Sequence, residues 1–95
     1  IALNSEINSM ELHDELKKLS TELLHVELMD YIRGNLVPVP QEESLATYAK
    51  KIEKTESLLD FSKEAVTLHN QVRAFAWGPG SHTTFVGQRL KIHKT

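Results

Sequence analysis

The stretch FSKEAVTLHNQVRAFAWGPGSHTTFVGQRLKIH, residues 61–93, decides the fold class, because two different periodicities follow one another within it. Its first half repeats apolar residues at helical spacing, at Phe61, Ala65, Leu68, Val72 and Phe75. This spacing predicts an amphipathic helix over residues 61–76. Ser62 is the expected N-cap, and a hydrophobic staple should join Phe61 to Val66.

The second half, from His82 to His93, predicts a β-hairpin. Gly87-Gln88 suits a two-residue type II′ turn, because glycine takes the first position. The expected cross-strand pairs are Val86–Arg89, Phe85–Leu90, Thr84–Lys91, Thr83–Ile92 and His82–His93. One face of this hairpin is mostly apolar and the other is polar and basic, so the register is self-consistent. Residues 61–93 therefore predict an α+β fold.

Upstream, residues 1–36 predict a short strand and then a long helix. Residues 1–7 alternate apolar and polar side chains, as in a strand. Asn8 or Ser9 is the expected N-cap of a helix over residues 9–33, with Glu11 completing a capping box. Its apolar stripe consists of Leu12, Leu16, Leu19, Leu23 and Val26. Because the chain supplies little that could cover this stripe, we expect it to be a piece of a longer protein.

Residues 37–52 separate the two patterned regions. Pro38 and Pro40 disfavour helix and stiffen the segment, which is typical of an interdomain linker. The two helices are therefore expected to bury their apolar faces in separate cores. The predicted core residues are Leu16, Leu19, Leu23, Phe61, Leu68, Val72 and Phe75.

The net charge of −2 is unevenly distributed. Residues 1–36 carry seven acids and three bases, a balance of −4, whereas residues 61–95 carry one acid and five bases, a balance of +4. A basic end can mark a surface that meets nucleic acid, but by itself it is more often a surface whose lysines only solubilise the protein. The absence of cysteine excludes disulfides and thiol nucleophiles and fits a reducing compartment. No apolar run approaches transmembrane length.

Four segments, in order, resemble the methionyl-tRNA formyltransferase family. They are Glu11-Leu-His-Asp-Glu-Leu16, the run Pro38-Val-Pro-Gln41 with Thr47-Tyr-Ala-Lys-Lys-Ile52, the helix end Val72-Arg-Ala-Phe75, and Gly87-Gln-Arg-Leu-Lys-Ile92. One stretch departs, since Phe75-Ala-Trp-Gly-Pro-Gly80 stands where the family commonly has Phe-x-Pro-Trp-Pro-Gly. Sugar N-formyltransferases and 10-formyltetrahydrofolate hydrolases or dehydrogenases share the transferase domain and stay open as alternatives, as does a stand-alone nucleic-acid-binding module.

The resemblance implies three parts. Residues 1–36 would end an α/β formyltransferase catalytic domain, residues 37–52 would be the linker, and residues 53–95 would begin an oligonucleotide-binding-type barrel, here incomplete. The family transfers a formyl group from 10-formyltetrahydrofolate to the amine of initiator methionyl-tRNA, a cytoplasmic step of translation initiation. No catalytic or folate-binding motif position of the family falls in this chain, so the chain alone is expected to be inactive. Its implied partners are the tRNA and the rest of the catalytic domain.

Four basic residues are the candidate tRNA-binding site. Lys51 and Lys54 match the lysine pattern of the family's linker, and Arg89 and Lys91 alternate on the polar face of the predicted hairpin. Such contacts with phosphate would give affinity and register rather than sequence choice. The predicted pairing of His82 with His93 offers only two metal ligands, which is a poor metal site.

Overall fold

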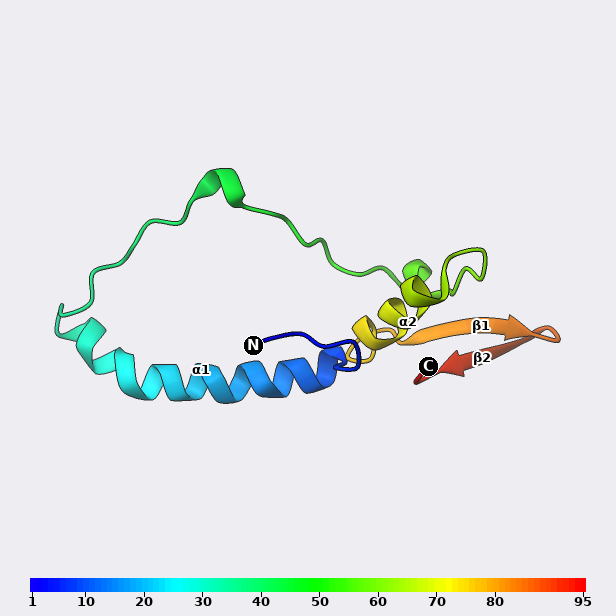
Figure 1. Ribbon diagram of the computed structural model, residues 1–95, viewed down its shortest axis with the longest axis horizontal. Coiled ribbons are helices and arrows are strands. Elements are labelled where there is room, and N and C mark those ends of the chain that lie inside the picture. The colour runs from blue at the N-terminus through cyan, green and yellow to red at the C-terminus, as the bar shows by residue number, and fades with distance from the viewer.

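The computed structural model describes residues 1–95 as an elongated α+β molecule (Figure 1). The elements are α1 (Ser9–Ile32), the 3-10 helices η1 (Glu43–Leu45) and η2 (Lys54–Ser57), α2 (Ala65–Ala74), β1 (Ser81–Phe85) and β2 (Gln88–Ile92). The radius of gyration is 18.7 Å and the extents are 63 × 29 × 22 Å. A compact chain of this length has a radius of gyration of about 12 Å. The predicted α+β class is confirmed, but the chain does not collapse around one core.

The long helix α1 forms as predicted, because both of its ends carry complete caps. The Asn8 side chain accepts hydrogen bonds from the backbone N–H groups of Met10 and Glu11, and the Glu11 carboxylate accepts one from the Asn8 N–H. This reciprocal pair is the capping box expected from the residue types. At the other end Gly34 adopts a φ of 76°, and its N–H and that of Asn35 donate back to carbonyls of the last turn.

The strand predicted for residues 1–7 is wrong. Those residues contain no strand. Instead the Asn4 side-chain oxygen accepts hydrogen bonds from the backbone N–H groups of Glu6, at 2.9 Å, and Ile7, at 2.7 Å. This bends the backbone into a turn. A strand also needs a hydrogen-bonded neighbour, and no other segment of the chain pairs with these residues.

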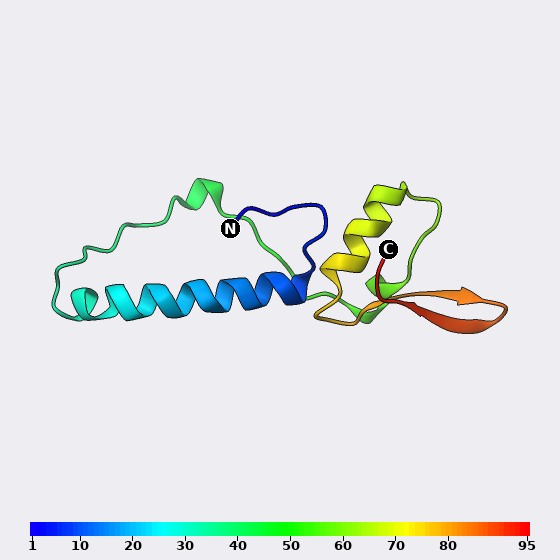
Figure 2. The same cartoon turned by 60° about the horizontal axis from the view of Figure 1, so that its bottom comes forward.

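The apolar stripe of α1 is exposed to solvent, so the prediction that it forms a core is wrong for this chain. Leu16 is 47% exposed, Leu19 49% and Leu23 59%. Figure 2 shows that α1 extends away from α2 and the hairpin, with only the N-terminal segment and the thin arc that follows the helix beside it. The spacing of the leucines sets their common face, but it does not supply the layer that would cover them. The two helices share no core, as predicted.

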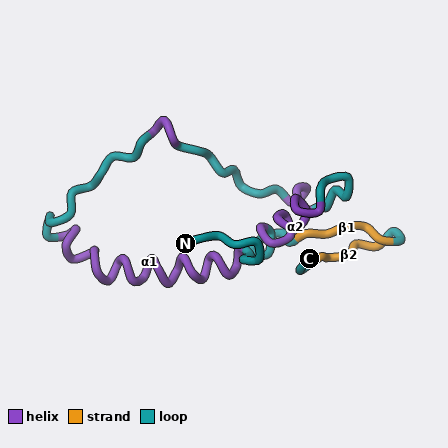
Figure 3. The backbone as a smooth tube through the Cα atoms, in the orientation of Figure 1, coloured by secondary structure: helices purple, strands orange, loops and turns teal.

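Residues 37–53 run as an extended strap interrupted only by η1, which is drawn as the long upper loop in Figure 3. Val37 and Val39 are exposed, as are Leu45 and Tyr48. No helix in this chain has the length and apolar character needed to cross a membrane.

The start of α2 differs from the prediction. Its N-cap is Glu64, not Ser62. The Ser62 hydroxyl and backbone N–H instead donate hydrogen bonds to the Asp60 carboxylate, at 2.7 and 3.0 Å. Phe61 and Val66 are both largely exposed, so they form no staple. Because Ser62 and Asp60 close a local turn, the helix begins after that turn rather than within it.

The stability of the turn at Asp60 is expected to depend on pH. The hydrogen bonds from the Ser62 side chain and then its backbone, with a smaller contribution from Lys63, hold the pKa of Asp60 below its ordinary value. A lowered carboxyl pKa stabilises the turn above the unfolded pKa of about 3.9, and this stabilisation is lost as pH falls through the folded pKa. Ser62→Ala should therefore raise the pKa of Asp60, as followed by carboxyl NMR titration. Ser20→Ala, on α1, should leave it unchanged. An unaltered pKa in Ser62→Ala would contradict the account.

The hairpin forms, but its turn lies one residue earlier than predicted. Phe85 pairs with Gln88, so the two-residue loop is Val86-Gly87 rather than Gly87-Gln88. Val86 has a φ of 48° and Gly87 a φ of 73°. Positive φ at both central positions is the signature of a type I′ turn, whose twist matches that of the flanking strands. The glycine thus takes the second turn position.

The change of turn shifts every cross-strand pair but keeps the two faces. Thr83 lies opposite Leu90, not Ile92, and His82 lies opposite Lys91. The predicted pairing of His82 with His93 is therefore wrong. Because the register moves by two residues, each side chain stays on its predicted face.

Val86 is the costly residue of this turn. A β-branched residue is strained at positive φ, by about 1–3 kcal/mol. Val86 is also 85% exposed, so replacing it loses little burial. Val86→Asn should therefore raise the free energy of opening of the hairpin by about 1 kcal/mol. Amide hydrogen exchange of β1 and β2 measures this. Val86→Thr, which keeps the branched Cβ, is the control and should show no gain. If amide exchange is no slower in Val86→Asn than in the native protein, the turn is not strained.

Candidate nucleic-acid interface

An open groove of about 630 Å³ lies between η2 and the hairpin. Its lining residues are Lys54, Thr55, Ser57, Leu58, Pro79, His82 and Arg89. None of these side chains is acidic, and two of them, Lys54 and Arg89, are cationic. A groove of this charge attracts anions and holds no carboxylate that would repel them.

A short parallel bridge builds the groove. Leu58 pairs with His82, and the Leu59 N–H donates a hydrogen bond to the His82 carbonyl at 2.8 Å. The Gln71 side-chain amide of α2 also holds this segment, because it donates hydrogen bonds to the backbone carbonyls of Glu56, at 2.9 Å, and Leu58, at 3.3 Å. The segment after η2 is thereby held against the first strand of the hairpin. The small buried core of the chain lies here and consists of Ser57, Leu59, Val72 and Ser81.

A polar cluster in the groove brings together Ser57, His82 and Arg89. Ser57 is only 1% exposed, and its hydroxyl donates to the Lys54 carbonyl at 2.6 Å. His82 Nδ1 lies 3.0 Å from the Ser57 hydroxyl oxygen and 3.3 Å from Arg89 Nη2. Because the Ser57 hydrogen is engaged by the Lys54 carbonyl, Nδ1 can either donate its own proton to Ser57 or, when that proton is on Nε2, accept one from Arg89.

Residues 51–95, which contain the whole groove, match the family described as formyl transferase, C-terminal domain. Over 94 residues the chain is 49% identical to the methionyl-tRNA formyltransferase of Bdellovibrio bacteriovorus, an alignment that covers 99% of the chain and 30% of that relative. Residues 51–95 belong to the formyl transferase family.

Other relatives agree. The methionyl-tRNA formyltransferase of a Synechococcus species is 41% identical over 92 residues, covering 97% of the chain and 28% of that relative. That of Coxiella burnetii is 40% identical over 90 residues, covering 95% of the chain and 29% of that relative. The chain thus spans about 30% of the length of the formyl transferases that it matches.

The formyl transferase C-terminal domain brings together two of the four predicted tRNA-binding residues. Lys54 and Arg89 line one groove. Lys51 lies exposed in the extended segment before η2, outside the groove. Lys91 is also exposed and lies opposite His82 in the hairpin, but it borders a separate hollow of about 300 Å³ near the start of α1.

Sequence reasoning missed Ser57 and His82 as groove residues. The sequence pattern predicts no role for Ser57 and pairs His82 with His93. The bridge from Leu58 to His82 joins segments far apart in the chain, and no local pattern announces it. The small-residue burial at Ser57 is likewise a property of the packed structure alone.

Proposed function

We propose that this chain is part of a methionyl-tRNA formyltransferase, which transfers a formyl group from 10-formyltetrahydrofolate to the amine of initiator methionyl-tRNA in the cytoplasm. The observation that carries the proposal is the 49% identity, over 94 residues, to a relative that bears this name. The match to the C-terminal domain over residues 51–95 supports it.

The proposal divides the chain into three parts. Residues 1–36 end the catalytic domain, residues 37–52 are the linker, and residues 53–95 begin a barrel-type tRNA-binding domain. The exposed stripe of α1 supports the first assignment, because such a face needs a covering layer. The extended strap with Pro38 and Pro40 supports the second. The hairpin supports the third, because β1 pairs with β2 and also bridges Leu58, as a strand with neighbours on two sides would do in a barrel.

The chain's own contribution is affinity for the tRNA backbone. Lys54 and Arg89 form the centre of the proposed contact, because they share a groove without acidic side chains. Lys51 and Lys91 extend it on either side, both exposed. Cations that neutralise phosphates release counterions, so such binding is strong at low salt and weakens as salt rises.

The chemistry belongs to the rest of the enzyme. Formyl transfer to an amine needs a base for the amine proton and hydrogen-bond donors for the developing oxyanion. The catalytic residues of the family and its folate site lie at motif positions outside this chain. We therefore assign no catalytic and no folate-binding role to any of its residues.

The test is an acceptor comparison with the full-length enzyme and formyl-labelled 10-formyltetrahydrofolate. We expect label on methionyl-tRNA, little on an amino-sugar nucleotide, and little loss of donor without an acceptor. The 95-residue chain, assayed alongside, should transfer nothing. Preferential labelling of the amino sugar would favour a sugar N-formyltransferase. Rapid release of formate, or its oxidation, without an acceptor would favour a 10-formyltetrahydrofolate hydrolase or dehydrogenase. Either result would overturn the proposal.

A further inference from the structure

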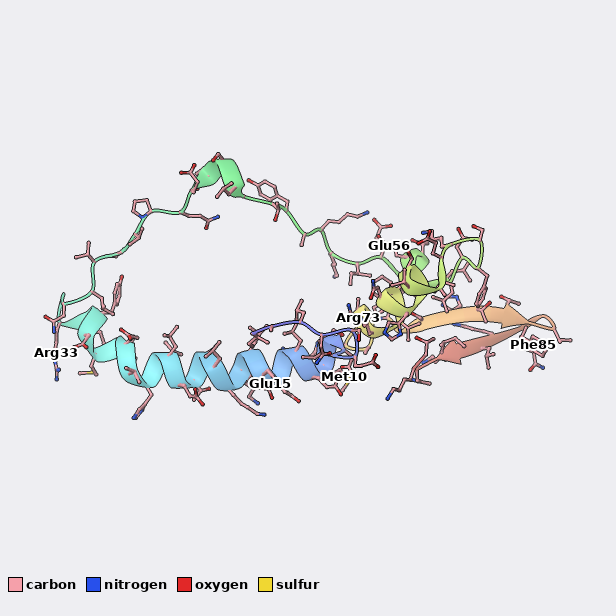
Figure 4. The ribbon with its side chains drawn as sticks, in the orientation of Figure 1. Met10, Glu15, Arg33, Glu56, Arg73 and Phe85 are labelled. Carbon is pink, nitrogen blue, oxygen red and sulfur yellow. The ribbon has the colours of Figure 1, made fainter.

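One arginine holds the turn that precedes α1 against α2. Arg73 lies in the last turn of α2, and its Nη1 donates hydrogen bonds to the backbone carbonyls of Asn4 and Ile7, each at 3.0 Å. Its Nε donates to the Asn70 side-chain oxygen at 2.9 Å, which fixes the guanidinium plane. Figure 4 shows Arg73 at the junction between the N-terminal arm, residues 1–8, and the C-terminal part of the chain. Because both acceptors are backbone atoms, the arginine recognises the shape of the turn.

Two further residues contact this region: His69 contacts the arm, and Trp77 contacts the start of α1. His69 Nε2 lies 2.8 Å from the Ser5 carbonyl, and its Nδ1 lies 2.9 Å from the Thr95 hydroxyl. The carbonyl can only accept, so Nε2 carries the proton. The Trp77 backbone N–H donates to the Ser9 hydroxyl at 2.8 Å, and the Trp77 ring stacks on His13 with 4.2 Å between ring centroids. The arm and the first turns of α1 are thus held at three points by α2 and the loop after it.

We propose that Arg73, with His69 and Trp77, forms an orientation clamp that sets the angle between α1 and the tRNA-binding part of the chain. The inference rests on the proposed function in one respect, namely that α1 belongs to the catalytic domain. The linker cannot set this angle, because residues 37–52 form an extended strap with little burial. The clamp instead joins α2 to backbone carbonyls of the segment before α1, and joins the loop after α2 to Ser9 at the start of α1.

The clamp makes Arg73 a positioning residue for tRNA. The groove with Lys54 and Arg89 is fixed to α2 through Gln71, so the direction of α1 determines where the groove lies relative to the catalytic domain. A hydrogen bond from a charged donor is strong enough that losing both carbonyl contacts should raise the detached population of the arm at least about tenfold.

The test uses spin labels on the full-length enzyme at Glu22 of α1 and Gln88 of β2, both exposed positions. In the native enzyme we expect one narrow distribution of label-to-label distances. Arg73→Met keeps the aliphatic stem but removes the donors, so it should broaden the distribution and speed amide exchange of residues 4–9 at least about tenfold. Arg33→Met is the matched control, because Arg33 is exposed and its side chain makes no hydrogen bond.

A second readout separates positioning from simple stability. With methionyl-tRNA as acceptor, Arg73→Met should raise the KM several-fold and leave kcat nearly unchanged, and Arg73→Lys should restore part of the loss. If Arg73→Met does not fold, Ser9→Ala removes the acceptor of the Trp77 N–H and should broaden the distance distribution in the same way. Distances and exchange equal to those of the native enzyme would overturn the clamp. The distance and exchange measurements need no tRNA. The clamp can therefore fail while the proposed function stands, and the proposed function can fail while the clamp stands.

Discussion

Replacing Lys54 and Arg89 together by alanine in the full-length enzyme is expected to weaken binding of methionyl-tRNA about tenfold at low salt. The two cations line one groove that has no acidic residue, so both can meet the same stretch of phosphate backbone. Each phosphate contact contributes a slope of about 0.9 to the dependence of log affinity on log salt concentration. Losing two contacts should therefore lower that slope by nearly two. Filter binding at four salt concentrations measures both quantities.

The control for this pair removes the same charge elsewhere. Lys17 and Lys18 lie on the exposed face of α1, where Lys18 pairs with Glu15 at 2.7 Å. Their double alanine variant should leave affinity and slope nearly unchanged. The affinity for 10-formyltetrahydrofolate should not change in either variant. If both double variants lose the same affinity and slope, the effect is one of net charge, and the groove has no special role.

Replacing Leu19 by alanine is expected to destabilise the full-length enzyme by about 2–5 kcal/mol, the usual cost of emptying a buried leucine site. Leu19 is 49% exposed in this chain, in the middle of the apolar stripe of α1. We expect that stripe to pack against the rest of the catalytic domain. In the 95-residue chain the same substitution should cost little, because the site is already half in water. Urea unfolding of both proteins measures the difference.

Thr21→Ala is the control for the stripe. Thr21 lies on the polar side of α1, with its hydroxyl donating to the Lys17 carbonyl at 2.9 Å. Its replacement should change the free energy of unfolding by less than about 0.5 kcal/mol. A loss in Leu19→Ala no larger than that of Thr21→Ala in the full-length enzyme would show that the stripe remains uncovered. The assignment of residues 1–36 to the catalytic domain would then be wrong.

Local chemistry explains which elements were predictable. Asn8 and Glu11 cap α1 through hydrogen bonds within one turn, so their types are sufficient to place the helix start. The faces of the hairpin follow from alternation, which any even shift of register preserves. Its turn was misplaced because the strained φ of Val86 contradicts the preference of a β-branched residue. Strand twist outweighs that preference here.

Long-range packing explains what was missed. The periodicity of α1 identifies an apolar face, but not what covers it, so Leu16 and Leu19 were predicted to be buried and are exposed. Residue type and family resemblance predict that Lys54 and Arg89 share one surface. Their meeting in one groove depends on the bridge from Leu58 to His82, for which the sequence contains no local signal.

The most direct test of the account is a single-turnover formylation assay of the full-length enzyme in which Lys51, Lys54, Arg89 and Lys91 are all replaced by alanine. The central claim is that these residues supply affinity for tRNA and take no part in the chemistry. An interaction made equally with substrate and transition state changes half-saturation and not the rate at saturation. We therefore expect the methionyl-tRNA concentration at half-maximal rate to rise strongly, while the maximal rate stays close to that of the native enzyme. A maximal rate that falls with half-saturation unchanged would contradict it.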